Sequence, residues 1–164
     1  METTYAYLAG MIDIHGVVSI ARRTSQRRDG QMGYCVRVAL SDTSPVVPDL
    51  LHSLFPSSSL SHAQPRKASY SRFWLWEAEH NQAREPLLRL LPHLRLKRRQ
   101  AELALALMGL AEKQNAGRSL SKPLSAEQHA MRHHLYEEVA RLNSERGPRK
   151  RRVQAEPVRL DGGQ

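Results

Sequence analysis

The 164-residue chain holds one cysteine, and aromatic residues make up only 5% of it. The lone Cys35 excludes an internal disulfide, and its apolar neighbours favour packing over reactivity. The first residues lack the charged start and apolar core of a signal peptide, and the most apolar stretch, 103–111, falls short of a membrane span. We therefore expect a cytoplasmic or nucleoid-associated protein with no membrane partner.

Positive charge is what the sequence has in excess. Lysine and arginine number 25 against 16 acidic residues, which gives a formal net charge of +9. A surplus of this size usually reflects an anionic partner, most often nucleic acid, and a basic surface on an ordinary fold is the less favoured alternative. The length suits one domain, 1–143, followed by a basic tail, 144–164, that we expect to be flexible.

The hydrophobic patterns predict an α+β protein with the order αββαββα and further helices at its C-terminal end. The expected elements are a helix capped by Thr3 or Thr4 and stopped by Gly16, strands 17–23 and 34–41, a helix opened by Ser44-Pro45 and running to about 55, strands 58–64 and 69–78, and helices 83–91, 96–113 and 125–143, the last with a capping box at its start.

The first helix carries apolar residues on two sides. One face holds Tyr5, Leu8, Ala9 and Ile12, and a second holds Tyr7, Gly10 and Ile14. A short helix that is apolar on two sides must be covered on both. One side can pack on its own sheet, and the other is expected to pack on a second helix.

Two stretches carry a resemblance to a known family. Residues 8–16, LAGMIDIHG, resemble the LAGLIDADG motif of a family of homing endonucleases, with matches at Leu, Ala, Gly, Ile, Asp and the final Gly. Residues 91–101, LPHLRLKRRQA, resemble the segment that opens the late helix in single-motif, homodimeric members from algal organelles. The resemblance covers about 4–143, and it adds an organelle to the possible locations.

The resemblance implies a homodimer. In such proteins two motif helices, one from each subunit, pack side by side along a twofold axis, and this chain has one motif. The implied dimer interface holds Tyr7, Gly10, Asp13 and Ile14, where Gly10 would allow close approach of the backbones. The family favours a small residue where this chain has Ile14, so the two helices are expected to be spaced or rotated differently.

The resemblance also implies a saddle-shaped antiparallel sheet that lies in the major groove of a long, pseudo-palindromic double-stranded DNA site. The implied DNA-binding residues are Arg22, Arg23, Arg27, Arg28, Arg37, His62, Gln64, Arg66, Lys67, Arg72 and Lys97. Those between the paired strands would bind phosphate rather than bases. For any one of them the alternative is a solvated charged face. Trp74 and Trp76 share a side with Arg72, where they could contact bases or pack under the sheet, and both alternatives stay open.

His15 stands where active members of the family carry the acidic residue that holds a divalent metal. Magnesium prefers oxygen ligands and takes imidazole poorly. Asp13 cannot replace the missing carboxylate because it lies two residues earlier, roughly 200° around the helix. The family's other catalytic positions correspond to Leu40 and Ser44-Pro45, and only the basic Lys97 is retained. We expect no catalytic residues and no cofactor, with Mg²⁺ or Mn²⁺ needed only if cleavage is retained.

Three functions follow from the sequence. The favoured one is a cleavage-deficient, sequence-specific DNA-binding protein, such as a repressor or other regulator. The second is an active homing endonuclease in which His15 binds a softer metal such as manganese or zinc. The third is a maturase-like RNA-binding splicing cofactor, which the basic stretch 149–152 would suit. For His129, His133 and His134 a helix-packing or solvated role is favoured over a metal site.

Overall fold

The computed structural model describes residues 2–24, 32–63, 72–116 and 124–145, and every structural statement below concerns these. Five predicted DNA-binding residues lie outside this part of the chain, together with nearly all of the predicted tail: Arg27, Arg28, Gln64, Arg66 and Lys67. None of the helices in the described part has the length and apolar character that crossing a bilayer requires.

The observed elements confirm the predicted αββαββα order and the α+β class. They are α1 (Glu2–Ile14), β1 (Gly16–Thr24), β2 (Met32–Asp42), α2 (Val46–Leu54), β3 (Ser59–Ala63), β4 (Phe73–Glu79), the 3₁₀ helix η1 (His80–Ala83), α3 (Arg84–Leu90), α4 (Arg98–Asn115) and α5 (Ala126–Ser144). The strands form one antiparallel sheet in the order β1-β2-β4-β3.

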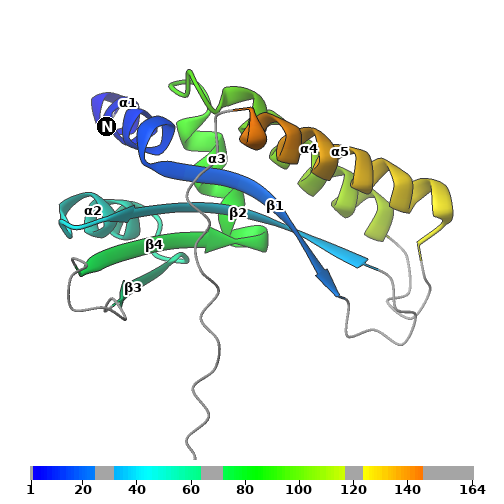
Figure 1. Ribbon diagram of the computed structural model, residues 1–164, viewed down its shortest axis with the longest axis horizontal. Helices are drawn as coiled ribbons and strands as arrows, with labels where there is room; N and C mark the ends of the chain where they lie inside the picture. Colours follow the sequence, from blue (N-terminus) through cyan, green and yellow to red (C-terminus); the bar gives the residue numbers. More distant parts are fainter. Residues whose placement is uncertain (1, 25–31, 64–71, 117–123, 146–164) are drawn as a thin grey trace, which may run out of the picture.

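The helices gather on one side of the sheet. Figure 1 shows α1, α4 and α5 above β1, α3 passing behind β1, and α2 beside β2 and β4. The core lies between these helices and the sheet, and the strands contribute alternate side chains to it, as a half-covered sheet requires. The almost fully buried strand residues on this face are Val18, Ile20, Val36, Val38, Leu40, Trp76 and Ala78, and Cys35 and Ala39 of β2 are buried on the opposite face.

Trp76 belongs to this core rather than to a base-contacting surface. Its side chain is 0% exposed, and its indole Nε1 donates a hydrogen bond to Ser58 Oγ at 2.7 Å. Ser58 Oγ donates in turn to the Phe55 carbonyl at 2.6 Å, so the one polar atom of the indole is satisfied inside the core. The alternative in which this tryptophan packs under the sheet is therefore correct.

Some element boundaries differ from the predicted ones. Helix α1 begins at Glu2, before the predicted threonine cap. The sequence predicts Ser44 as the N-cap of α2 and Pro45 as its first residue. In the structure Pro45 is the N-cap, and Ser44 Oγ accepts a 3.4 Å hydrogen bond from the backbone N–H of Val46. The predicted capping box of α5 is confirmed, with Ser125 and Gln128 each accepting from the other's backbone.

Gly16 is required by close packing at the junction of α1 and β1. A Cβ placed on it would lie 2.8 Å from the Ile12 Cα and 2.9 Å from the Ile12 carbonyl oxygen. Such distances are shorter than real Cβ contacts, so a side chain would force the strand away from the helix. The glycine therefore lets β1 leave the last turn of α1 at once.

Candidate nucleic-acid interface

The outer face of α1 is apolar and uncovered in the described chain. Tyr7 is 52% exposed and Ile14 is 66% exposed, whereas Leu8 and Ile12 on the opposite face are 0% exposed. Gly10 lies between the two exposed side chains, and a Cβ placed on it would meet nothing within 4 Å. The two predicted faces of this helix are thus both present, and the second face is a flat strip with room for close approach.

Asp13 uses its carboxylate inside its own chain. It is 7% exposed, and its Oδ2 accepts hydrogen bonds from the backbone N–H groups of Arg95 at 2.7 Å and Leu96 at 3.0 Å. Its Oδ1 accepts from the backbone of Lys97 at 2.8 Å. These donors lie just before α4 and have no partner within that helix, so Asp13 ties the end of α1 to the start of α4. The resemblance implies a dimer-interface role for Asp13, whereas its buried carboxylate has this intrachain role.

Lys97 differs most from the prediction, which placed it against DNA. Its side chain is 2% exposed, and its Nζ donates to the Ile12 carbonyl at 2.7 Å and to the Asp13 carbonyl. Both carbonyls belong to the last turn of α1, where carbonyls lack helical partners and a positive charge is favourable. Lys97 therefore caps α1 and is not presented to a phosphate.

Among the described residues, the sheet face opposite the helices pairs arginine with glutamate, whereas the sequence predicts a basic surface. Arg23 Nη2 donates to both carboxylate oxygens of Glu79 at 2.7 Å, and this hydrogen bond raises the pKa of Arg23. Arg37 Nε donates to Glu77 Oε2 at 2.7 Å and lies 3.9 Å from Glu79 Oε1. Two predicted DNA-binding arginines thus face two acidic residues of β4.

The two acidic residues were missed in the sequence, although a signal was present. In the stretch FWLWEAE of β4, Glu77 and Glu79 alternate with the buried Trp76 and Ala78, so they must point to the other face. The register then decides their partners, because Arg37 pairs with Glu79 and Ala39 pairs with Glu77 across the β2–β4 ladder.

No protein-family model matches the chain, and no curated protein matches it in sequence. Solved structures do match. The homing endonuclease I-CvuI in complex with its target gives a TM-score of 0.68 at 18% identity, over 86% of this chain and 82% of that one. The archaeal intron-encoded homing endonuclease I-Vdi141I complexed with DNA gives 0.67 at 13% identity, over 91% and 89%. The chain has the LAGLIDADG homing-endonuclease fold.

A larger protein shares this homing-endonuclease fold over part of its length. Meganuclease I-SmaMI bound to uncleaveable DNA gives a TM-score of 0.62 at 11% identity. The match covers 81% of this chain but 43% of that one. The chain therefore corresponds to less than half of I-SmaMI and to most of I-CvuI.

At the motif of this fold, the residues present do not fit a magnesium ion. His15 directly follows α1, its backbone N–H donates to the Met11 carbonyl at 2.8 Å, and its side chain is exposed. The neighbouring Asp13 carboxylate already accepts three backbone hydrogen bonds. Among the described residues, the cluster of three side chains with metal-ligand spacing lies elsewhere, on the sheet. The junction offers an imidazole where magnesium needs oxygen ligands.

The remaining predicted DNA-binding residues lie at the edges of the sheet. The guanidinium carbon of Arg22 lies 5.8 Å from the ring centre of Tyr136 on α5, so it faces the helices. Arg72 is exposed just before β4. His62 on β3 is also exposed, and its ring lies 4.6 Å from that of Trp74. Arg22 and His62 thus lie on the face opposite Arg23 and Arg37, and Arg72 precedes the strand.

The late histidines include a packing contact, as predicted. His133 Nδ1 lies 3.0 Å from the Tyr34 hydroxyl, and the His129 ring lies 5.6 Å from the Tyr34 ring. Burial raises the pKa of Tyr34. These contacts fasten α5 to the start of β2, which accounts for two of the three histidines without a metal.

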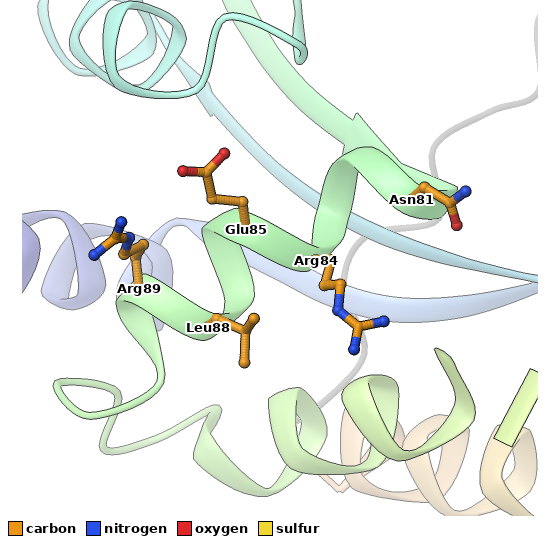
Figure 2. A pocket seen from close by; sticks show the side chains of 5 residues that line it. All are labelled: Asn81, Arg84, Glu85, Leu88 and Arg89. Carbon is orange, nitrogen blue, oxygen red and sulfur yellow. The ribbon is translucent and has the colours of Figure 1, made fainter. Parts of the chain in front are cut away.

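A surface depression of about 520 Å³ lies at η1 and α3, and its lining does not form a candidate binding or catalytic site. Figure 2 shows its lining, which comes from η1 and the following α3: Asn81, Arg84, Glu85, Leu88 and Arg89. Arg84 donates to Glu112 of α4, so its charge is already paired. The depression therefore brings together neighbours in sequence rather than a constellation of distant groups.

Proposed function

We propose that the chain is a homodimeric, sequence-specific double-stranded DNA-binding protein that does not cleave its site. The observation that carries the proposal is the uncovered apolar face of α1, with Tyr7 at 52% and Ile14 at 66% exposure on either side of Gly10. A second copy of the same face would bury it by twofold symmetry. The net charge of +9 and the fold shared with DNA complexes support DNA as the partner.

The coverage of the solved structures supports two copies. One chain matches most of I-CvuI and I-Vdi141I but 43% of I-SmaMI, so two copies would reach about the size of that meganuclease. Two sheets related by a twofold axis would favour a pseudo-palindromic site. Binding without cleavage would suit a repressor or another regulator, because the protein would stay on an intact site.

His15 supports the loss of cleavage. Strand hydrolysis by a bound metal needs charge neutralisation at the attacking and leaving oxygens. In a homodimer one substitution removes both motif carboxylates together. The buried Lys97 and the engaged Asp13 leave neither group available to replace them.

The dimer is tested with Ile14→Arg, which places a charge in the proposed interface without touching the core. Sedimentation should show a dimer for the native protein and a monomer for Ile14→Arg. Leu88→Arg is the matched control, because Leu88 is also exposed, at 52%, but lies on α3. A monomeric native protein, or a dimer unaffected by Ile14→Arg, would contradict the proposed interface.

Cleavage is tested on duplexes selected by the protein from a random pool. We expect palindromic sequences, binding that weakens steeply with salt, and no double-strand break with Mg²⁺ or Mn²⁺. His15→Asp should restore cleavage if this position alone disables the scaffold. Clean cleavage by the native protein that His15→Ala abolishes would instead establish an active endonuclease. Preference for structured RNA over duplex DNA at fixed salt would favour the splicing cofactor.

The sheet contributes to DNA binding only if its ion pairs open. Partly exposed pairs of this kind are worth roughly 0–1 kcal/mol, so a phosphate or guanine could displace Glu77 from Arg37. Glu77→Gln should therefore tighten DNA binding by about fivefold, since it removes one repulsive charge and releases one arginine. Glu85→Gln on α3 is the control for net charge alone. Equal effects of the two variants would place DNA away from the sheet.

A further inference from the structure

Three potential metal ligands meet on the sheet face opposite the helices, where Cys35 is buried at 1% exposure, Glu79 is half-buried and His80 is exposed. Cys35 lies on β2, Glu79 ends β4, and His80 begins η1. The Cys35 Sγ, a Glu79 carboxylate oxygen and a His80 ring nitrogen all lie within 4.8 Å of one another. Arg37 pairs with Glu79 across the ladder, so Cys35, two residues earlier on the same face, is a diagonal neighbour of Glu79.

The backbone at His80 is in an uncommon conformation. Its φ is 51°, and no other non-glycine residue in the described part of the chain has a positive φ. A side chain in this left-handed region costs of order 1 kcal/mol, and such conformations concentrate at functional sites. At this residue the chain leaves β4 for η1 while the imidazole stays beside the thiol and the carboxylate.

The carboxylate of Glu79 is already oriented. Arg23 Nη2 donates to both of its oxygens at 2.7 Å. Each carboxylate oxygen has a further lone pair, so Arg23 and a metal ion can be bound together. Hydrogen bonds of this kind from outside the coordination sphere commonly fix ligand carboxylates in metal sites. Arg23 is therefore a positioning residue for this cluster.

We propose that Cys35, Glu79 and His80 bind one zinc ion, with water as the fourth ligand. A thiolate, an imidazole and a carboxylate are the ligands that zinc prefers, and one thiolate with one carboxylate balances its double charge. Zinc bonds of about 2.0–2.3 Å require ligand atoms roughly 3.5 Å apart. Rotation of the exposed His80 side chain and the half-buried Glu79 side chain toward the buried Cys35 Sγ supplies the contraction from 4.8 Å. The bound ion would link β2 directly to the junction of β4 and η1.

The proposed zinc site differs in position and in ligand chemistry from the region around His15, where α1 meets β1. His15 follows α1, whereas these ligands stand on strands β2 and β4 and the helix η1. The sulfur ligand selects against magnesium and for zinc or cobalt. Zinc binding releases the thiol proton, so the affinity should rise with pH. The proposal concerns metal binding alone and holds whether or not the protein binds DNA.

The test uses the full chain without a histidine tag, titrated with cobalt(II) and then zinc. We expect one cobalt ion per chain, a charge-transfer absorption between thiolate and cobalt, and its loss when one equivalent of zinc is added. Because this is the single cysteine of the chain, Cys35→Ser should abolish that absorption. His80→Asn keeps a residue that tolerates positive φ and should weaken zinc binding by ~10-fold or more.

His134→Asn is the matched control, because His134 is an exposed histidine on α5. It should leave the affinity for zinc unchanged, and circular dichroism should show that all variants are folded. An absent thiolate–cobalt absorption in the native protein would overturn the proposal. So would zinc binding of equal strength in the native protein, Cys35→Ser and His80→Asn, because the ion would then lie elsewhere.

Discussion

Asp13 and Lys97 hold each other through two different groups. The backbone N–H of Lys97 donates to the carboxylate of Asp13, and the Lys97 amine donates to the backbone carbonyl of Asp13. The pair joins the end of α1 to the start of α4 across 84 residues of sequence. Asp13 accepts hydrogen bonds from N–H groups at the start of α4, and Lys97 donates to carbonyls at the end of α1. We therefore expect substitutions of either residue to lower the stability of the fold.

Asp13→Asn should lower the free energy of unfolding by about 3 kcal/mol. The amide offers one accepting oxygen to three backbone donors, one buried and two part-buried, and turns an N–H toward the others. Hydrogen bonds to a charged group are worth about 1.5–3 kcal/mol each. Urea denaturation measures the change. Asp49→Asn, on an exposed side chain in the first turn of α2, is the control and should cost less than about 1 kcal/mol. Equal costs would contradict the anchoring role.

Lys97→Met should also destabilise the fold, by about 2 kcal/mol, because it leaves two carbonyls of α1 without their donor. Its effect on DNA separates this role from phosphate binding. A lysine that binds phosphate would reduce the salt dependence of binding by about one ion when it is removed. We expect the slope of log affinity against log salt to be unchanged. A reduced slope in a stable variant would restore the predicted DNA contact.

Gly16→Ala and Gly10→Ala should act in opposite directions on the stability of the monomer. At Gly16 the added methyl would lie 2.8 Å from the Ile12 Cα, and overpacking of this kind costs about 1–3 kcal/mol. At Gly10 it would meet nothing within 4 Å, and alanine in a helix gains roughly 0.5–1 kcal/mol over glycine. Thermal denaturation measures both changes.

Gly10→Ala should nevertheless weaken the proposed dimer, because the methyl group would separate two closely packed α1 helices. Dilution experiments by sedimentation would give the dissociation constant. A variant that is more stable as a monomer yet dissociates more easily would identify α1 as the contact. Unchanged dissociation would place the contact on another surface.

The thiol of Cys35 should ionise at higher pH in the folded, metal-free protein than in the unfolded chain. Burial raises its pKa, and Glu79 adds to the effect. A raised folded pKa means that this contribution to stability is complete below the unfolded pKa and is lost as pH rises through the folded one. Thiolate absorbance of the native protein and of the Cys35→Ser control measures the titration. A midpoint at or below that of the denatured protein would contradict it.

The element order and both faces of α1 could be predicted because their signals are local. The spacing predicts that Leu8 and Ile12 share one apolar face and that Tyr7 and Ile14 share another, and the structure shows the first buried and the second exposed. The capping box at Ser125 likewise lies within four residues. Such patterns depend on the periodicity of one element and need no knowledge of its partners.

The charge of the sheet could not be predicted in this way. Alternation places Trp74 and Trp76 on one face but does not say which face is buried. The pairing of Arg37 with Glu77 further depends on the register between β2 and β4, which are far apart in sequence. The position of Lys97 could not be predicted for the same reason, because its partners are carbonyls of α1 that lie 84 and 85 residues earlier in the sequence.

The tight junction at Gly16 leaves no slack between α1 and β1. Asp13 is also bound to the start of α4. A rotation of α1 would therefore move the sheet with it as one rigid body. In the proposed dimer, the crossing angle of the two helices would therefore set the distance between the base pairs that the two sheets can reach. The size of the Ile14 side chain would set the distance between the two α1 helices, and with it the spacing of the two DNA half-sites.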